Sequence, residues 1–229
     1  MCLVSHVKRE NRAKVMVGAS LHRQAWIPQA KTGITMKKLL AVITVFLITF
    51  ALAAPLGVSG SVKTSAAIQN LRIAAFLVDR NGNPSKELIS VNPNSTSFAL
   101  SIPDAAPIAS SLGALSSDAL DWPGLLGDVK ITGQARAVRA MLRGYNDADK
   151  NGSFGAGDKL LETTLTRGRG NLIIIYAESR FRVQGDRGFD LTLEAGWNLV
   201  AIELGKVIET KRVERIEGVQ LEVFASQGY

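Results

Sequence analysis

The stretch NDADKNGSFGAGD, which ends at Asp158, places oxygen-bearing side chains at a spacing that could bind a metal ion. It follows the calcium-loop pattern D-x-[DN]-x-[DN]-G-x5-E up to the last position. Asp147, Asp149 and Asn151 occupy positions 1, 3 and 5, Gly152 supplies the sharp turn at position 6, and Asp158 occupies position 12. Alternate side chains of a tightly curled loop converge, so these oxygens form a hard-donor set that suits Ca²⁺.

The same loop also has features that predict weak binding. In the pattern, Ser153 would offer its backbone carbonyl and Gly155 would hold a water molecule. Asp158 stands in place of the usual Glu, and Lys150 and Lys159 reduce the negative field. We therefore expect an affinity in the extracellular range, about 10⁻⁴ to 10⁻³ M. The alternative is a solvated hairpin turn, because Asp, Asn and Gly are also common turn residues.

The N-terminal part of the chain has the form of an export signal. Residues 36–38 (MKK) precede a continuous apolar run, and residues 51–53 (ALA) have the small-residue form that signal peptidase reads. We expect residues 36–53 to be a signal peptide, cleaved between Ala53 and Ala54. The alternative is an uncleaved anchor, although a run of about 16 residues is short for a bilayer span. Residues 1–35 are interpreted as an over-extended start or a long n-region.

Removal of residues 1–53 changes the chemistry that the chain can perform. Eight of the 27 Lys and Arg residues and one of the 20 acidic residues lie in this segment, which leaves 19 of each and no net charge. Cys2, His6 and His22 lie there too, so the mature chain would have neither cysteine nor histidine. This excludes disulfides, thiolate nucleophiles, Ser-His-Asp triads and the common zinc sites. A neutral chain also gives no electrostatic reason to bind nucleic acid or an anionic membrane.

From Ser61 onward the sequence alternates with period two and is interrupted by Gly, Asn, Asp and Pro, which predicts an all-β protein. We expect an antiparallel β-sandwich of the immunoglobulin or prealbumin-like kind, with one or two sandwich units. The predicted order is a first β unit (54–102), a connection rich in Ala, Ser, Gly and Pro (103–129), and a second β unit (130–229) that carries the loop 147–158. The connection is either a linker or a packed excursion with a short helix around Leu112–Leu120.

Three details of the second unit follow from its pattern. Asn171–Tyr176 is apolar on both faces and predicts a central strand. The arginines within Gln134–Tyr145 do not share one side of a strand, so an exposed edge or a bulge is expected there. Ala195 and Gly196 indicate a hairpin between two strands.

A second group of acids lies near an aromatic residue. Asp118, Asp121 and Asp128 surround Trp122, and a pair of carboxylates beside a tryptophan could hydrolyse a glycosidic bond. The simpler interpretation is that these acids belong to loops and that Trp122 is a core residue.

The segment GYNDADKNGSFGAGDKLLETTL (144–165) resembles the strand, calcium loop and strand of prealbumin-like (Cna B-type) repeats of bacterial surface proteins. The likeness covers only some 22 residues, and it departs from the family pattern at Gly155 and Asp158. The resemblance implies a structural calcium held by Asp147, Asp149, Asn151 and Asp158.

The sequence therefore predicts an exported, non-catalytic β-sandwich protein of a bacterial cell envelope, located in the periplasm, the envelope or outside the cell. Its predicted cofactor is one structural Ca²⁺, and its predicted partners are envelope proteins or a surface polymer. We expect no nucleic-acid partner, and we expect contact with a membrane only through an uncleaved signal. Two alternatives remain open: a carboxylate-based glycan hydrolase, and a carrier with an apolar cavity inside the β fold.

Overall fold

The computed structural model describes residues 55–116, 120–134 and 136–225, so residues 1–35 and the predicted signal peptide 36–53 lie outside the described part. The short 3₁₀ helices are η1 (Ala109–Ser111) and η3 (Asp186–Gly188). The strands are β1 (Gly57–Thr64), β2 (Leu71–Val78), β3 (Pro84–Val91), β4 (Ser97–Ser101), β5 (Gly113–Ala114), β6 (Lys130–Thr132), β7 (Arg136–Asn146), β8 (Lys159–Leu160), β9 (Glu162–Thr166), β10 (Gly170–Ala177), β11 (Phe181–Gln184), β12 (Asp190–Leu193), β13 (Gly196–Leu204), β14 (Ile208–Val213) and β15 (Arg215–Phe224).

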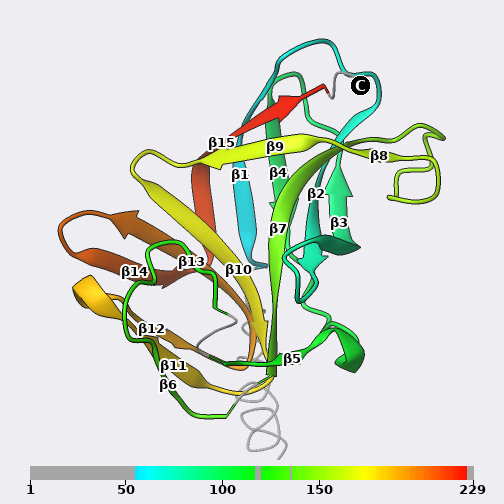
Figure 1. The fold of residues 1–229 in the computed structure, drawn as a ribbon. Helices are drawn as coiled ribbons and strands as arrows, with labels where there is room; N and C mark the ends of the chain where they lie inside the picture. Colours follow the sequence, from blue (N-terminus) through cyan, green and yellow to red (C-terminus); the bar gives the residue numbers. More distant parts are fainter. Residues whose placement is uncertain (1–54, 117–119, 135, 226–229) are drawn as a thin grey trace, which may run out of the picture. The chain divides into compact units, whose positions relative to one another are not determined.

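The described strands form three sheets (Figure 1). The central sheet has the order β14-β13-β10-β7-β2-β3, and β5 and β8 add short pairings to β7. A second sheet has the order β4-β1-β15-β9 and a third has the order β12-β11-β6. Neighbouring strands are antiparallel, with the exception of β1 and β15, which are parallel. The prediction of an all-β protein with packed antiparallel sheets is confirmed.

The main core lies between the four-stranded sheet and the central sheet. Alternate residues of β1 and β15, such as Val58 and Leu221, pack against Ile73 of β2 and Leu142 of β7, and all four are at most 5% exposed. Period-two alternation of apolar side chains thus produces one buried face on each sheet. At about 25 cal/mol per Å² of apolar surface removed from water, this burial is the main favourable term for folding.

Strand β10 is covered on both faces. Leu172 and Ile174 belong to the main core, whereas Ile173 and Ile175 pack with Phe181 and other side chains of the three-stranded sheet in a second core. The prediction of a central strand at Asn171–Tyr176 is confirmed, because β10 lies between β13 and β7. A strand buried on both faces needs consecutive apolar residues, which β10 has at residues 172–175 (LIII).

Strands from before and after the predicted connection share the same sheets. β1 pairs with β15 and β2 pairs with β7, so residues from 54–102 are hydrogen-bonded to residues from 130–229 in both large sheets. The described residues between 55 and 225 belong to one compact unit by their contacts. The two sequence ranges therefore contribute to common cores.

The short helix that the sequence offers as one alternative around Leu112–Leu120 does not occur in the described residues of that range. Gly113–Ala114 forms β5 on β7, and Leu112 is buried against Leu77 and Val138. The 3₁₀ helix η1 lies just before Leu112. The Arg136 guanidinium donates to the carbonyl oxygens of residues 109 and 112, at 2.6 and 3.0 Å. These bonds attach this part of the connection to β7.

Two other expectations are corrected. β7 is an interior strand, and its three arginines donate to backbone carbonyl oxygens outside the strand, those of residues 109, 112, 121 and 163. A guanidinium can therefore lie on an interior strand when other segments supply acceptors. The hairpin at Ala195 and Gly196 does not form, because β12 pairs with β11 while β13 pairs with β10. The chain passes there from one sheet to another.

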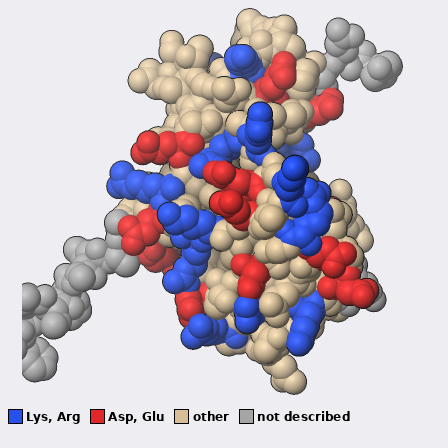
Figure 2. Space-filling view, turned by 90° about the vertical axis from the view of Figure 1, so that its left-hand side faces the viewer, with Lys and Arg blue, Asp and Glu red and all other residues tan. Residues whose placement is uncertain are grey.

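Charges of both signs are interspersed on the face that carries the β13–β14 hairpin (Figure 2). Glu194 forms ion pairs with Arg180 and Arg212, and Arg182 pairs with Asp190. The Arg182 guanidinium, through its hydrogen bonds, holds the pKa of the Asp190 carboxyl below its usual value. Within the three described ranges, no helix has the length and apolar character needed to cross a bilayer.

Candidate metal-binding loop

The loop 147–158 connects two paired strands of the central sheet. β7 ends at Asn146, β8 begins at Lys159, and these two residues are partners in the ladder. The flanks are therefore strands, as the sequence predicts. The left-handed turn that the pattern assigns to Gly152 is present, with φ of 85°. Lys150, at φ of 60°, adds a second left-handed residue that the pattern does not predict.

The three predicted acidic ligands come together. Asp147, Asp149 and Asp158 each offer a carboxylate oxygen, and these oxygens lie within 4.8 Å of one another. Asp147 is buried, Asp149 is exposed and Asp158 is partly buried. Three converging negative charges repel one another unless a cation or hydrogen-bond donors compensate them, so the arrangement is suited to a divalent cation.

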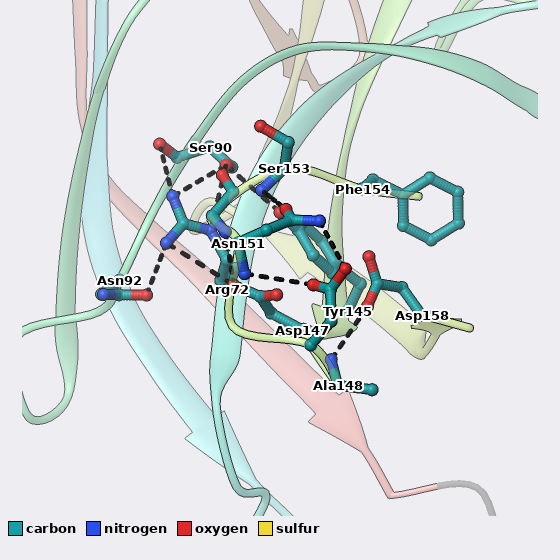
Figure 3. A network of polar contacts seen from close by, with 12 residues as sticks. Arg72, Ser90, Asn92, Tyr145, Asp147, Ala148, Asn151, Ser153, Phe154 and Asp158 are labelled. Atoms are coloured by element: carbon teal, nitrogen blue, oxygen red, sulfur yellow. Dashed lines mark hydrogen bonds and ion pairs between the residues drawn. The ribbon is translucent and has the colours of Figure 1, made fainter. Parts of the chain in front are cut away.

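Asn151 and Ser153 are joined to this cluster through hydrogen bonds (Figure 3). The Asn151 amide donates to Asp149 Oδ2 at 2.5 Å, and Asn151 Oδ1 accepts from the Ser153 N–H at 2.7 Å. In this conformation Ser153 enters the network through its N–H rather than through the carbonyl that the pattern assigns to it. Asn151 Oδ1 has a second lone pair, so it can accept this N–H and still coordinate a cation.

Asp158 closes the loop from its far end. One carboxylate oxygen accepts from the Ala148 N–H at 2.8 Å and the other from the Gly155 N–H, also at 2.8 Å. Charge-assisted bonds of this kind stabilise a carboxylate and fix its position. Asp158 thus preorganises the loop, whether or not it also contacts an ion.

The environment of Asp147 is the least satisfied in the loop. Among the described residues, two that are polar or charged are buried: Asp147 is 4% exposed and Asn198 is 1% exposed. Asn198 is fully used: its amide donates to two carbonyls and its oxygen accepts from the Glu194 N–H. Asp147 Oδ1, in contrast, has no hydrogen-bond partner among the described residues. A buried carboxylate oxygen without a partner is costly, and a cation would satisfy it.

The second oxygen of Asp147 is held by the protein. Asp147 Oδ2 accepts from the Gly152 N–H at 3.0 Å and lies 4.0 Å from Arg72 Nη1. Arg72, on β2, is fixed in turn by Ser90 Oγ and by Asn92 Oδ1 (Figure 3). The two oxygens of Asp147 therefore differ: the protein binds Oδ2, whereas Oδ1 has no hydrogen-bond partner among the described residues.

An aromatic cluster anchors the other side of the loop. Phe154 packs edge-on against Phe76 and Tyr145, with ring centroids 5.2 and 5.4 Å apart. The Phe154 N–H donates to Glu87 of β3 at 2.8 Å. Burial raises the pKa of Tyr145 to about 12, to which the nearby Glu87 also contributes, while the bond to Ser90 opposes the rise. The loop is therefore attached to β2, β3 and β7.

Sequence reasoning missed the partners that lie on β2 and β3. Arg72, Glu87 and Ser90 are distant from the loop in sequence and follow no motif. One signal was present: Arg72 is the single charged residue in the otherwise apolar stretch LRIAAFLV. A charged side chain in a strand with two buried faces needs a partner.

Two of the three acids predicted around Trp122 belong to the described residues. Asp121 and Asp128 are exposed, whereas Trp122 is 6% exposed and belongs to the second core. Asp118 lies outside the described residues. Neither of the two cavities described in this structure is lined by these acids or by Trp122, and both open to solvent.

Comparison of the chain with protein-family models, with curated proteins and with solved structures finds no match. The functional argument therefore depends on the residues themselves.

Proposed function

We propose that this protein is an exported, non-catalytic β-sandwich protein of the cell envelope, in which one structural Ca²⁺ fixes the β7–β8 loop. The observation that carries the proposal is Asp147 Oδ1, a buried carboxylate oxygen without a partner in a cluster of three acids. The donor set consists of oxygen atoms, which suits Ca²⁺ better than softer metals.

The role proposed for the ion is structural. Asp147, Asp149 and Asp158 supply carboxylates, Asn151 adds its amide oxygen, and Ser153 adds its carbonyl after a small rearrangement. The loop covers Phe76 and Tyr145 on the central sheet. An ion that neutralises the acids would therefore stabilise this part of the sheet and hold a firm surface for contact with an envelope protein or a surface polymer.

Calcium binding is tested by calorimetric titration and by thermal unfolding of the purified protein. For a dissociation constant of 10⁻⁴ to 10⁻³ M, about 10 mM Ca²⁺ should stabilise the fold by about 1.4 to 2.7 kcal/mol. Asp147→Asn keeps the size of the side chain and should abolish the response.

The matched control is Asp79→Asn. Asp79 caps the β2–β3 turn by accepting the N–H groups of Asn81 and Asn83, and it lies outside the acidic cluster. This variant should keep the full calcium response. If the unchanged protein shows neither binding heat nor a higher midpoint, the loop is a polar turn and the proposal is wrong.

Export is tested separately. The protein expressed with its own leader in a bacterium should be recovered outside the cytoplasm, with an N-terminus at Ala54. Retention in the cytoplasm with residues 36–53 intact would contradict this part of the proposal.

A further inference from the structure

A surface cavity of about 540 Å³ lies directly beside the loop. Three connections surround it: the β1–β2 connection, the β3–β4 connection, and the start of the loop through Asp147 and Lys150. Its volume is within the range of about 300 to 1,000 Å³ typical of small-molecule sites. The calcium-dependent element proposed above therefore forms one wall of a ligand-sized cavity.

The lining combines apolar surface with hydroxyl and amide groups. Ala67, Ile68, Leu71 and Pro93 provide an apolar patch, and the hydroxyls and amides come from Thr64, Ser95, Asn70 and Asn92. Apolar carbon surface next to amides and hydroxyls suits a sugar ring, which has C–H groups as well as hydroxyls. None of the lining residues is aromatic, so hydrogen bonds and charge must dominate recognition.

The charges of the cavity favour an anion. Arg72 and Lys150 line it together with one acid, Asp147. The carboxylate of Asp147 is already used, because Oδ2 is held by the Gly152 N–H and Oδ1 belongs to the proposed calcium site. With an ion bound, this wall of the cavity carries excess positive charge. A guanidinium, moreover, matches the planar geometry of a carboxylate.

The two cations are also positioned in different ways. The side chain of Arg72 is 14% exposed and is fixed by Ser90 Oγ at 3.1 and 3.0 Å. Its bond to Asn92 Oδ1, at 2.9 Å, lies at the exposed rim, where a ligand can replace or extend it. Lys150 is held on the loop in a left-handed conformation, so an ordered loop should fix its direction.

We propose that this cavity binds the carboxylated ring of an acidic saccharide, and that binding is strengthened when calcium occupies the loop. The inference rests on the calcium site proposed above, and it gives the surface-polymer partner a chemical class. The carboxylate lies against Arg72 and Lys150, and the ring hydroxyls bind Asn70, Asn92 and Ser95.

The test is a solution NMR titration of the ¹⁵N-labelled protein at a fixed free calcium concentration. D-Glucuronate is the ligand, D-glucose is the uncharged control and inorganic phosphate is the competing anion. We expect glucuronate to shift the side-chain amides of Asn70 and Asn92, with no shift from glucose at the same concentration. Removal of calcium with a chelator should weaken glucuronate binding at least about fivefold.

Lys150→Asn is the decisive variant. Asn tolerates the left-handed backbone, so the substitution removes the charge without adding strain. Glucuronate binding should weaken about fivefold, and calcium binding should persist because Lys150 is no ligand of the ion. Lys159→Asn is the matched control: Lys159 also flanks the loop but does not line the cavity, so this variant should bind glucuronate unchanged.

The possible outcomes separate the two proposals. Shifts with phosphate but not glucuronate would assign the cavity to phosphate and overturn the saccharide. Equal shifts with glucose, or none with any ligand, would overturn it as well. Equal glucuronate binding with and without calcium would overturn the calcium dependence. Calorimetry without saccharide measures calcium binding alone. A failure of the calcium proposal is therefore detected separately from a failure of the saccharide proposal.

Discussion

The ring of Phe154 lies edge-on against the ring of Tyr145, with centroids 5.4 Å apart and an interplanar angle of 80°. Phe154 belongs to the loop and Tyr145 is a fully buried residue of β7. This contact joins the most polar segment of the chain to the central sheet. It explains how a loop rich in Asp, Asn and Gly keeps a fixed position before any ion binds.

Phe154→Ala should therefore destabilise the fold and weaken calcium binding. Removal of a partly buried aromatic ring should lower the free energy of unfolding by about 2 to 3 kcal/mol, as measured by urea unfolding in the presence of a chelator. Ile108→Ala is the control, because Ile108 is 56% exposed and should change stability little. Equal effects of the two substitutions would mean that the aromatic contact does not anchor the loop.

Asp158→Ala and Asp149→Ala should behave differently without calcium. Asp158 accepts two backbone N–H groups from separate parts of the loop, so its loss should cost about 1 to 2 kcal/mol even in a chelator. Asp149 is exposed and, among the described residues, its side chain bonds only to Asn151, two residues away, so its loss should cost less than about 0.5 kcal/mol. Both variants should lose the calcium response. A small effect of Asp158→Ala in the chelator would show that Asp158 is not needed to close the empty loop.

Gly60→Ala should be strongly destabilising. A Cβ at Gly60 would lie 1.8 Å from the carbonyl oxygen of Val219, where β1 passes close to the parallel strand β15. Relief of this overlap requires a backbone shift, which should cost at least about 2 kcal/mol of unfolding free energy. Gly155→Ala is the matched control, since its Cβ would meet no atom within 4 Å. Unfolding with urea compares the two, and equal stability of both variants would argue against the close approach of β1 and β15.

Stability should fall at high pH through Tyr145. Its pKa is raised from 10.0 to about 12, so between these values the unfolded state loses the phenolic proton while the folded state keeps it. The folded state then becomes less stable as the pH rises. The contribution is fully present below about pH 10 and is lost toward pH 12, by at most about 3 kcal/mol.

The measurement is the free energy of unfolding at pH 9, 10 and 11, compared with Tyr145→Phe. The variant cannot ionise at this position, so the part of the pH dependence that comes from Tyr145 should disappear. An identical pH profile in the two proteins would show that Tyr145 does not cause the loss of stability at high pH.

The sequence by itself determined the elements and the local chemistry of the loop. Period-two alternation identified the strands, and continuous apolar character identified β10 as central, because a strand covered on both faces tolerates few polar side chains. The spacing of Asp147, Asp149 and Asp158 predicted their convergence, since a tight turn at Gly152 sets that geometry locally.

Only the tertiary structure decided which distant residues meet. Strand pairing depends on contacts far apart in sequence, so no local pattern predicted the parallel pair of β1 with β15 or the interior position of β7. Arg72 was recognisable as an anomaly in an apolar strand, but its partners Ser90 and Asp147 became neighbours only through the pairing of β2 with β3 and β7. The burial that leaves Asp147 Oδ1 without a partner has the same origin: it depends on sheet packing and not on the order of residues in the loop.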